Sequence, residues 1–463
     1  MFDEKGAVVS EGYEEIKTSC KNNNRVEHDP EELVTSIKKA IRGAVTKLDK
    51  SQYRIVSAGL ATQRSSMVCW DKVNGQALSP VISWQDRRAA AWVKKFDQYQ
   101  GKIHKITGLF ITAHYGVSKF KWCMDNLPAV KQASAEGSLV WGPLASFIIY
   151  RLLDEKPLLA DPANASRTLL YNMNTLGWDN DLLALFDVPE QTLPACVPSL
   201  FDFGHFYVDE IKIPLKIVTG DQSAALFAYG EPQSTAVYIN LGTGAFVQRV
   251  FNQSVDYVPK LLTSVVSQIK DEITYVLEGT VNGAGSAFVE VENLFGIEPL
   301  AAQKKLPQWL GQDIDIPLYL NGVSGLGSPY WVADFKSRFS FEGDDKQKIV
   351  AVAESIIFLI MVNLQEMEKI CTAPEYIVVT GGLSQNTALC QRLADLTQKE
   401  VFRPEECEGT AKGTAYLLMD NKPDWSEREK GLWIRPLENK KFNERFICWE
   451  ERMKQEISSI SRY

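Results

Sequence analysis

Histidine is scarce in this chain, and cysteine is scattered rather than grouped. The 463 residues include four histidines and eight cysteines, and no two cysteines form a Cys-x-x-Cys pair. Structural zinc sites need clustered thiolate and imidazole ligands, so none is expected here. Unpaired thiols in a reducing compartment are the simplest interpretation, which predicts a cytoplasmic protein.

Strongly basic segments and long apolar segments are also missing. The net charge is −8, and no basic stripe or tail is visible, which disfavours nucleic acid as a partner. The most apolar run, residues 356–362, is far shorter than the roughly 20 residues that cross a bilayer. No signal peptide opens the printed sequence, and we expect no membrane partner. A Gly-x4-Gly-Lys-Ser/Thr loop is absent, which argues against a P-loop kinase.

Strand and helix patterns alternate in the first half of the chain. Asp29 is suited to cap a helix that begins at Pro30. Apolar residues then recur every four positions on one helical face: Leu33, Ile37, Ile41 and Val45. Strands are predicted at 55–60 and 81–84, and a helix at 86–98. Because 45% of the residues are hydrophobic, the chain can bury a large core, and the mixture indicates α/β layers.

The second half of the chain repeats this plan from about residue 230. A glycine-turned hairpin comes first, and a long helix is predicted at 346–369. A strand at 376–379 then runs into Thr380-Gly381-Gly382, with a helix after it. Two halves of similar plan suggest a duplicated α/β fold with a cleft between the domains.

Asp221 is the first candidate for chemistry. It follows the apolar stretch Ile217-Val218-Thr219-Gly220 and precedes small residues. A carboxylate at the end of a strand can deprotonate an alcohol, and a helix N-terminus stabilises its charged form. The alternative is a helix cap without a catalytic role, and the spacing alone favours neither.

Two glycine turns are candidates for binding phosphate and nucleotide. Gly242-Thr243-Gly244 offers backbone N–H groups and a hydroxyl, although such turns also occur in ordinary hairpins. Gly381-Gly382 with Asn386 stands between a strand and a helix, which suits a bound nucleotide. A simple packing turn is the alternative. The loop 325–331 is either a lid or a connector.

Arg64 and the histidines are less certain candidates. Arg64 lies between two predicted strands, where it either binds substrate hydroxyls or pairs with a carboxylate in the core. His104 and His114 lack ligand-like spacing, and His104 is expected at the surface.

The order of these patches resembles the FGGY family of carbohydrate kinases, in the actin-like ATPase superfamily, and the glycerol kinases in particular. The resemblance covers about residues 2–449. It rests on residues 26–30, 62–64, 84–88, 107–119 with Trp122, 164–168, 220–222, 242–244, 329–331 and 381–382 with Asn386.

The resemblance implies the fold and the roles of the site residues. The fold would comprise two actin-like (ribonuclease H-like) domains, 1–230 and 231–463. ATP and Mg²⁺ would be the cofactors, with Asp221 as general base and metal ligand. The substrate contacts would be Arg64, Ser65, Trp84, His114, Asp221, Gln222 and Phe246. The nucleotide would contact Gly242, Thr243, Gly244, Gly285, Gly381, Gly382 and Asn386.

Two positions depart from the pattern of glycerol kinases. Ser65 stands where those kinases usually have a glutamate that accepts a hydrogen bond from the substrate. His114 stands where an ungapped count places their pocket tyrosine. Losing a charged acceptor costs about 1.5–3 kcal/mol of binding, so another polyol or sugar is as credible as glycerol.

The N-terminus is a third departure. Asp3-Glu4-Lys5-Gly6 predicts a turn followed by a strand at 7–9. The Asp-x-Gly-Thr hairpin arm that opens family members does not precede this turn, so an unpaired sheet edge is expected. The leading hypothesis is therefore an ATP-dependent kinase of a small polyol or sugar. The alternative is a catalytically impaired or non-catalytic homologue that binds nucleotide or sugar. A homodimer is possible.

Overall fold

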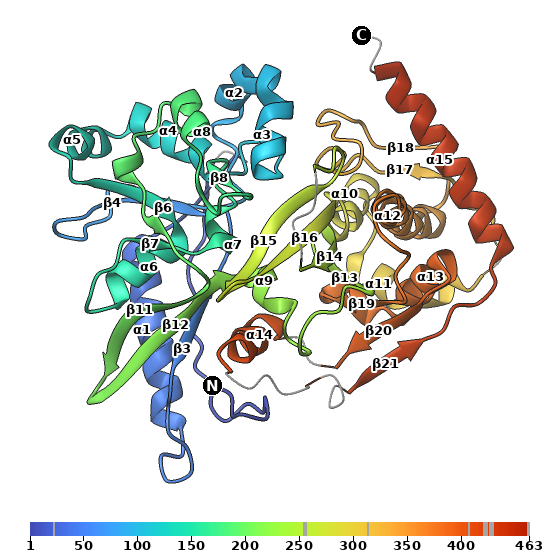
Figure 1. The fold of residues 1–463 in the computed structure, drawn as a ribbon. Helices are drawn as coiled ribbons and strands as arrows, with labels where there is room; N and C mark the ends of the chain where they lie inside the picture. The colour runs from blue at the N-terminus through green and yellow to red at the C-terminus, as the bar shows by residue number, and fades with distance from the viewer. Residues whose placement is uncertain are drawn as a thin grey trace.

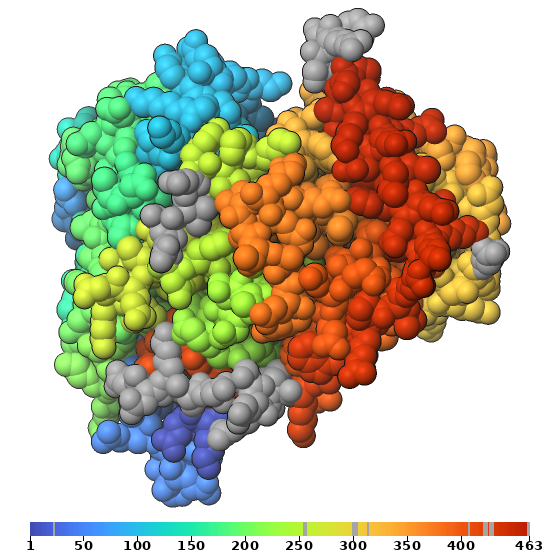
Figure 2. Space-filling model, turned by 45° about the vertical axis from the view of Figure 1, so that its right-hand side comes forward, coloured from blue at the N-terminus to red at the C-terminus, as the bar shows by residue number. Residues whose placement is uncertain are grey.

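The computed structural model describes residues 1–21, 24–252, 257–312, 314–405, 408–419, 425 and 430–460. The chain forms two α/β halves that stand side by side (Figure 1). The space-filling view shows the blue and green N-terminal half against the orange and red C-terminal half (Figure 2).

The N-terminal half contains the first twelve strands. They are β1 (Ser19–Lys21), β2 (Arg25–His28), β3 (Ala58–Thr62), β4 (Met67–Asp71), β5 (Val81–Ile82), β6 (Leu139–Pro143), β7 (Leu159–Ala160), β8 (Tyr171–Asn172), β9 (Gly177–Trp178), β10 (Ala195–Cys196), β11 (Leu200–Val208) and β12 (Ile211–Gly220). Its helices are α1 (Pro30–Lys47), α2 (Ala90–Val93), η1 (Lys94–Tyr99), α3 (Gln100–Thr107), α4 (Gly116–Asn126), α5 (Pro128–Glu136), α6 (Leu144–Leu152), α7 (Pro162–Ala165), α8 (Asn180–Phe186), η2 (Glu190–Thr192) and α9 (Asp221–Ala225).

Two sheets organise this half. One has the order β1-β2-β5-β4-β6, and the other has the order β11-β12-β3. Strand β12 pairs parallel with β3, and the register Gly220↔Thr62 brings the ends of both strands together. Residues that follow these two strands, Arg64 and Asp221, therefore start from the same sheet edge. Strand β3 is the last strand of its sheet among the described residues.

The C-terminal half contains the remaining elements. Its strands are β13 (Ala236–Leu241), β14 (Ala245–Phe251), β15 (Leu262–Ile269), β16 (Glu272–Val281), β17 (Tyr319–Leu320), β18 (Arg338–Phe339), β19 (Tyr376–Thr380), β20 (Glu400–Pro404) and β21 (Gly431–Ile434). Its helices are α10 (Gly285–Phe295), α11 (Pro299–Leu310), α12 (Asp345–Glu368), η3 (Gly382–Gln385), α13 (Thr387–Thr397), α14 (Gly409–Leu417) and α15 (Lys440–Ile460).

A single mixed sheet forms the centre of the C-terminal half. Its order is β15-β16-β14-β13-β19-β20-β21. Strand β13 is antiparallel to β14 but parallel to β19, which is itself parallel to β20. The carboxyl ends of β13 and β19 therefore meet at one edge of the sheet. The glycine turns 242–244 and 381–382 begin at that edge.

Helix α12 is the main core helix of this half. By length and composition it could cross a membrane, but 83% of its apolar stretch is buried inside the molecule. The residues that it buries include Ile356, Phe358 and Ile360, which pack into the largest hydrophobic cluster. A helix that is apolar on every face is typical of one that is buried in a protein core. The apolar character of α12 is thus explained by its burial.

The two halves are also joined through helix α14. Glycine lets this helix approach α9 closely, because a Cβ at Gly413 would lie 1.8 Å from the Ala224 carbonyl oxygen. The Thr410 hydroxyl donates to the Asp221 carbonyl oxygen at 3.2 Å. The C-terminal half therefore holds the backbone of the strand–helix junction that carries Asp221.

Most predicted elements are present, with shifted limits. Helix α1 begins at Pro30 as predicted, and the Asp29 carboxylate accepts from two first-turn amides. The strand predicted at 55–60 begins only at Ala58, because the backbone before it has no strand partner. The helix predicted at 86–98 is wrong over its first residues. Asp86 forms a turn with Arg88, and helix starts at Ala90.

The strand predicted at 7–9 is also wrong. The segment makes a single antiparallel bridge, Phe2↔Val8, across the predicted turn at Asp3. His104 is buried with 2% exposure rather than lying at the surface, because its ring packs on Phe110 and contacts the Leu261 carbonyl.

Candidate active site

Asp221 is the first residue of the short helix α9 and directly follows strand β12. Gly220 occupies the N-cap position and makes no side-chain cap. The Asp221 carboxylate accepts a hydrogen bond from the adjacent Gln222 amide at 2.7 Å. The side chain therefore does not act as the cap that was the non-catalytic alternative.

The surroundings of Asp221 suit a proton acceptor. Burial raises the pKa of its carboxyl, and the Arg64 guanidinium opposes part of this rise. A carboxylate with a raised pKa is a stronger base than a free one, provided that it stays ionised at working pH. The balance between burial and Arg64 thus sets its strength as a base.

Arg64 reaches from the N-terminal half to a carboxylate of the C-terminal half. It crosses over Gly220, where a Cβ would lie 2.5 Å from its side chain. Its Nη2 donates to Gln222 and lies 3.4 Å from Glu278 Oε2 on strand β16. The predicted alternatives for Arg64 are therefore compatible, since it pairs with a core carboxylate while lying next to Asp221.

Glu278 binds a second arginine as well. Arg167 Nη2 lies 3.1 Å from Glu278 Oε2, and Gln248 Nε2 donates to the same oxygen at 3.1 Å. Burial would raise the pKa of Glu278, but the two guanidiniums outweigh it and hold the pKa below its ordinary value. The carboxylate therefore stays charged and links both halves next to the site.

Ser65, Trp84 and His114 lie near one another. The Lys119 ammonium donates to the backbone carbonyls of both Ser65, at 2.7 Å, and His114. The Trp84 and His114 rings meet edge to face, with centroids 5.8 Å apart. The buried Lys119 thus joins Ser65 to His114, and the ring contact of His114 adds Trp84 to this group.

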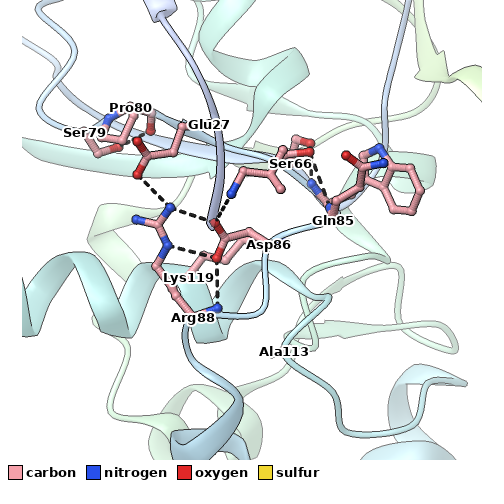
Figure 3. Close-up of polar contacts among 12 residues, drawn as sticks. Glu27, Ser66, Ser79, Pro80, Gln85, Asp86, Arg88, Ala113 and Lys119 are labelled. Atoms are coloured by element: carbon pink, nitrogen blue, oxygen red, sulfur yellow. Dashed lines mark hydrogen bonds and ion pairs between the residues drawn. The ribbon is translucent and has the colours of Figure 1, made fainter. Parts of the chain in front are cut away.

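A second ion network holds the turn that carries Trp84. Arg88 Nη2 lies 2.7 Å from Asp86 Oδ2 and 2.6 Å from Glu27 Oε1. Figure 3 draws both contacts as dashed lines. Asp86 Oδ2 also accepts from the Val26 amide at 2.7 Å. These contacts fasten the turn to strand β2, so Trp84 is presented from a rigid support.

The turn 242–244 lies under the start of helix α10. The Thr243 carbonyl accepts from the amides of Ala284 and Ser286, both at 3.0 Å. A Cβ at Gly285 would lie 2.9 Å from the Gly242 carbonyl oxygen, so glycine is required for this approach. Thr243 itself is exposed. Phe246 is half-buried and lies on the same face of β14 as Gln248.

The second glycine turn lies beside the first. The Asn240 amide donates to Thr380 Oγ1 at 3.2 Å across the two strand ends. Gly381 has φ of 91°, and a Cβ there would lie 2.6 Å from the Leu241 carbonyl oxygen. Nothing lies within 4 Å of a Cβ at Gly382. Asn386 caps helix α13, since its side chain accepts from the Leu389 amide. All seven predicted nucleotide contacts therefore lie along one edge of the C-terminal sheet or on the helices that start there.

Two family models match the chain. The N-terminal domain of the FGGY family of carbohydrate kinases matches residues 1–228, and its C-terminal domain matches residues 237–419. The chain belongs to the FGGY family of carbohydrate kinases. Curated relatives include the glycerol kinase of Halothermothrix orenii, which is 32% identical over 96% of this chain and 91% of that protein. The glycerol kinase of Thermococcus kodakarensis is 31% identical over 98% and 94%.

Solved FGGY structures share the whole fold. Plasmodium falciparum glycerol kinase with ADP has a TM-score of 0.88 at 23% identity, covering 98% of this chain and 94% of that one. A xylulose kinase from Brucella ovis has a TM-score of 0.85 at 19% identity, covering 100% and 96%. The predicted fold of two actin-like domains with mixed sheets is therefore confirmed, and this FGGY member is a carbohydrate kinase.

Sequence reasoning missed the partners of Arg64. The sequence patterns did not point to Glu278, and they assigned no role to Arg167, the second arginine that pairs with Glu278. A signal for Glu278 exists, since it interrupts the apolar strand Tyr275-Val276-Leu277, and a charged residue in a buried strand is almost always paired. Among the described residues, no group of three or more His, Cys, Asp or Glu could hold a metal by itself.

Proposed function

We propose that this chain transfers the γ-phosphoryl group of ATP to a hydroxyl of a small polyol or sugar. The observation that carries the proposal is the placement of Asp221 at the end of β12, beside Arg64 and Gln222. The glycine turns at the ends of β13 and β19 supply the opposing phosphate-binding edge. Glycerol is the first acceptor to test, since the curated relatives are named glycerol kinases.

In the proposed reaction, Asp221 takes the proton of the acceptor hydroxyl. The hydroxyl oxygen forms a bond to the γ-phosphorus while the bond from that phosphorus to the ADP oxygen breaks. Such transfers depend on positioning and on stabilisation of charge. Arg64 and Gln222 orient the acceptor beside the base, and the Gly242–Gly244 turn offers backbone donors to the phosphates.

Magnesium fits this arrangement through few protein ligands. Mg²⁺ in kinases binds one or two carboxylates together with phosphate oxygens and water. Asp221 supplies one carboxylate, which matches the absence of an all-protein metal cage in the described residues. When bound, the ion would neutralise phosphate charge.

A coupled assay of ADP release with Mg²⁺ and a panel of acceptors tests the proposal. Turnover is expected with at least one polyol, sugar or sugar acid. Asp221→Asn should lower kcat by about 10²–10⁴-fold while ADP binding, measured by calorimetry, is unchanged. Full activity of Asp221→Asn would rule out the assigned base.

We also propose a domain boundary, a cellular location and an oligomeric state. The domains divide near residues 229–233, between α9 and β13, which limited proteolysis would test. The protein works in the cytoplasm, which cell fractionation would test. It forms a homodimer, which light scattering on the purified chain would test.

A further inference from the structure

The acceptor side of the site is unusually rich in buried cations. Arg64, Arg167 and Lys119 are all less than a tenth exposed. Arg87 is exposed and lies beside Trp84 and His114. Glu278 is the carboxylate within ion-pair distance of Arg64 and of Arg167. Two guanidiniums therefore share one counter-charge.

Arg87 and Lys119 have neutral partners in place of a carboxylate. Arg87 Nη1 donates to the Trp84 carbonyl at 3.1 Å and lies 3.5 Å from His114 Nδ1. Lys119 donates to two backbone carbonyls. In the described part of the chain, neither forms an ion pair, since the nearby Asp86 is held by Arg88, which also holds Glu27.

These cations form a continuous arc that begins at the proposed base. Arg64 contacts Gln222, the neighbour of Asp221. Ser65 follows Arg64 and is joined through Lys119 to His114, which faces Arg87. Burial, then Lys119, Arg87, Arg167 and Arg64 in turn, hold the pKa of His114 well below its ordinary value. All four cations thus act on one point of the site.

Polar atoms on this arc also lack partners. Ser65 Oγ and Arg167 Nε are buried and have no hydrogen-bond partner among the described residues. Ser65 has φ of 64°, a backbone conformation that is uncommon for a residue other than glycine. Buried donors without acceptors are rare in folded proteins, and each requires an explanation.

We propose that the acceptor is a polyhydroxy acid, whose carboxylate lies against Arg87 beside Trp84 and His114 while its hydroxyl faces Asp221. This inference rests on the proposed kinase function and specifies the substrate class of the same site. A guanidinium binds a carboxylate through two parallel hydrogen bonds. Arg87 is exposed in the free protein and is therefore open to a ligand. A neutral polyol that covered it would exclude water and supply no counter-ion, and an unpaired buried charge is costly.

The charge balance favours a single negative charge on the acceptor. In their ordinary ionised states, the cations are Arg64, Arg87, Arg167 and Lys119. The anions are Asp221, Glu278 and the net single charge of the Glu27–Arg88–Asp86 network. With Lys119 protonated, one positive charge is left over, which one carboxylate neutralises. Burial lowers the pKa of Lys119 well below its ordinary value, and a carboxylate bound nearby would favour its charged form.

Matched pairs of acceptors test the inference with the full chain, ATP and Mg²⁺. The pairs are glycerol with glycerate and erythritol with erythronate. Within each pair, one terminal CH2OH group of the polyol is a carboxylate in the acid. We expect kcat/KM for the acid to exceed that for the polyol on the order of tenfold or more, the value of a charged hydrogen bond. Turnover in which the polyol equals or exceeds the acid would overturn the inference and leave the kinase proposal standing.

Two variants and one control sharpen this test. Arg87→Gln should remove the preference by raising KM for the acid alone. Ser65→Glu places an anion in the arc and should shift preference toward the polyol. Arg42 is an exposed arginine of helix α1. Arg42→Gln should leave the acid-to-polyol ratio of kcat/KM unchanged in both pairs. A preference for the acid that survives in Arg87→Gln would contradict the assigned contact.

Binding measurements keep the two proposals separate. If no acceptor is phosphorylated, the kinase proposal fails for this chain. Calorimetric titration with glycerate and with glycerol then still decides the inference about the acid. Tighter binding of glycerate, lost in Arg87→Gln, supports it. Equal or weaker binding of glycerate overturns it.

Discussion

The acceptor side and the nucleotide side of the site are built from different materials. The proposed acceptor side consists of charged and aromatic side chains, such as Arg64, Trp84 and His114. The buried ion pairs of Arg64 with Glu278 and of Arg88 with Asp86 support it. The nucleotide side consists mainly of backbone, with glycines that let strand ends and helix starts approach closely. Side chains can be exchanged one at a time, whereas a close backbone approach tolerates little change. We therefore expect substrate choice to reside on the proposed acceptor side.

The largest effect is expected where the two sides meet, at Glu278. Glu278→Gln leaves Arg64 and Arg167 buried without a counter-charge, which should lower the free energy of unfolding by about 3–5 kcal/mol. Denaturant unfolding would measure the loss. The exposed Glu272→Gln at the start of the same strand serves as the control and should change stability little.

The pH dependence of stability gives a further check on Glu278. Because its folded-state pKa is depressed, its contribution is present above the unfolded pKa and is lost as pH falls through the folded pKa. Glu278→Gln should remove this part of the acid destabilisation. An unchanged acid profile would show that the carboxylate is not charged in the folded protein.

Adjacent glycines test whether backbone alone defines the nucleotide side. Gly381 has φ 91° and ψ 168°, a region essentially restricted to glycine. Gly381→Ala should therefore cost about 1–3 kcal/mol of stability and weaken ATP binding. Gly382→Ala meets no atom within 4 Å and should leave stability unchanged. Equal losses of stability in both variants, measured by thermal unfolding, would contradict this assignment.

The smallest effect is expected in the pH profile of catalysis. The base must be ionised, so kcat/KM should fall as pH drops through the raised pKa of Asp221. Arg64→Gln removes the strongest opposing charge and should move this acidic limb to higher pH. Arg167→Gln should move it less, because Arg167 opposes the rise more weakly than Arg64. Identical limbs in all three proteins would argue against Asp221 as the titrating base.

Regular elements with strong local signals could be predicted from the sequence. Helix α1 begins at Pro30 because Asp29 caps it, and both signals lie within a few residues. The limits at 86–98 were wrong because Asp86 and Arg88 are held in a turn by long-range contacts with Val26 and Glu27 of strand β2. His104 was misplaced because its burial depends on Phe110 and Leu261, which no local pattern reveals.

The site residues show the same difference between local signals and contacts made by distant parts of the chain. Asp221 and the two glycine turns were recognisable, since a strand that ends in a carboxylate or in glycines is a local feature. Glu278 lies more than two hundred positions from Arg64 in the chain, so their pairing could not be read from spacing. The Lys119 contact with Ser65 was hidden for the same reason, since 54 positions separate the two residues.

The amino-acid sequence by itself determined the α/β class, the capped helices, the base candidate and the glycine turns, because these depend on neighbours along the chain. The tertiary structure decided which charges meet. It brought Arg64, Arg167 and Glu278 into one buried cluster across the two halves and left Arg87 with neutral partners. The physical reason is that a buried charge is defined by what surrounds it in space, and the chain order does not contain that information.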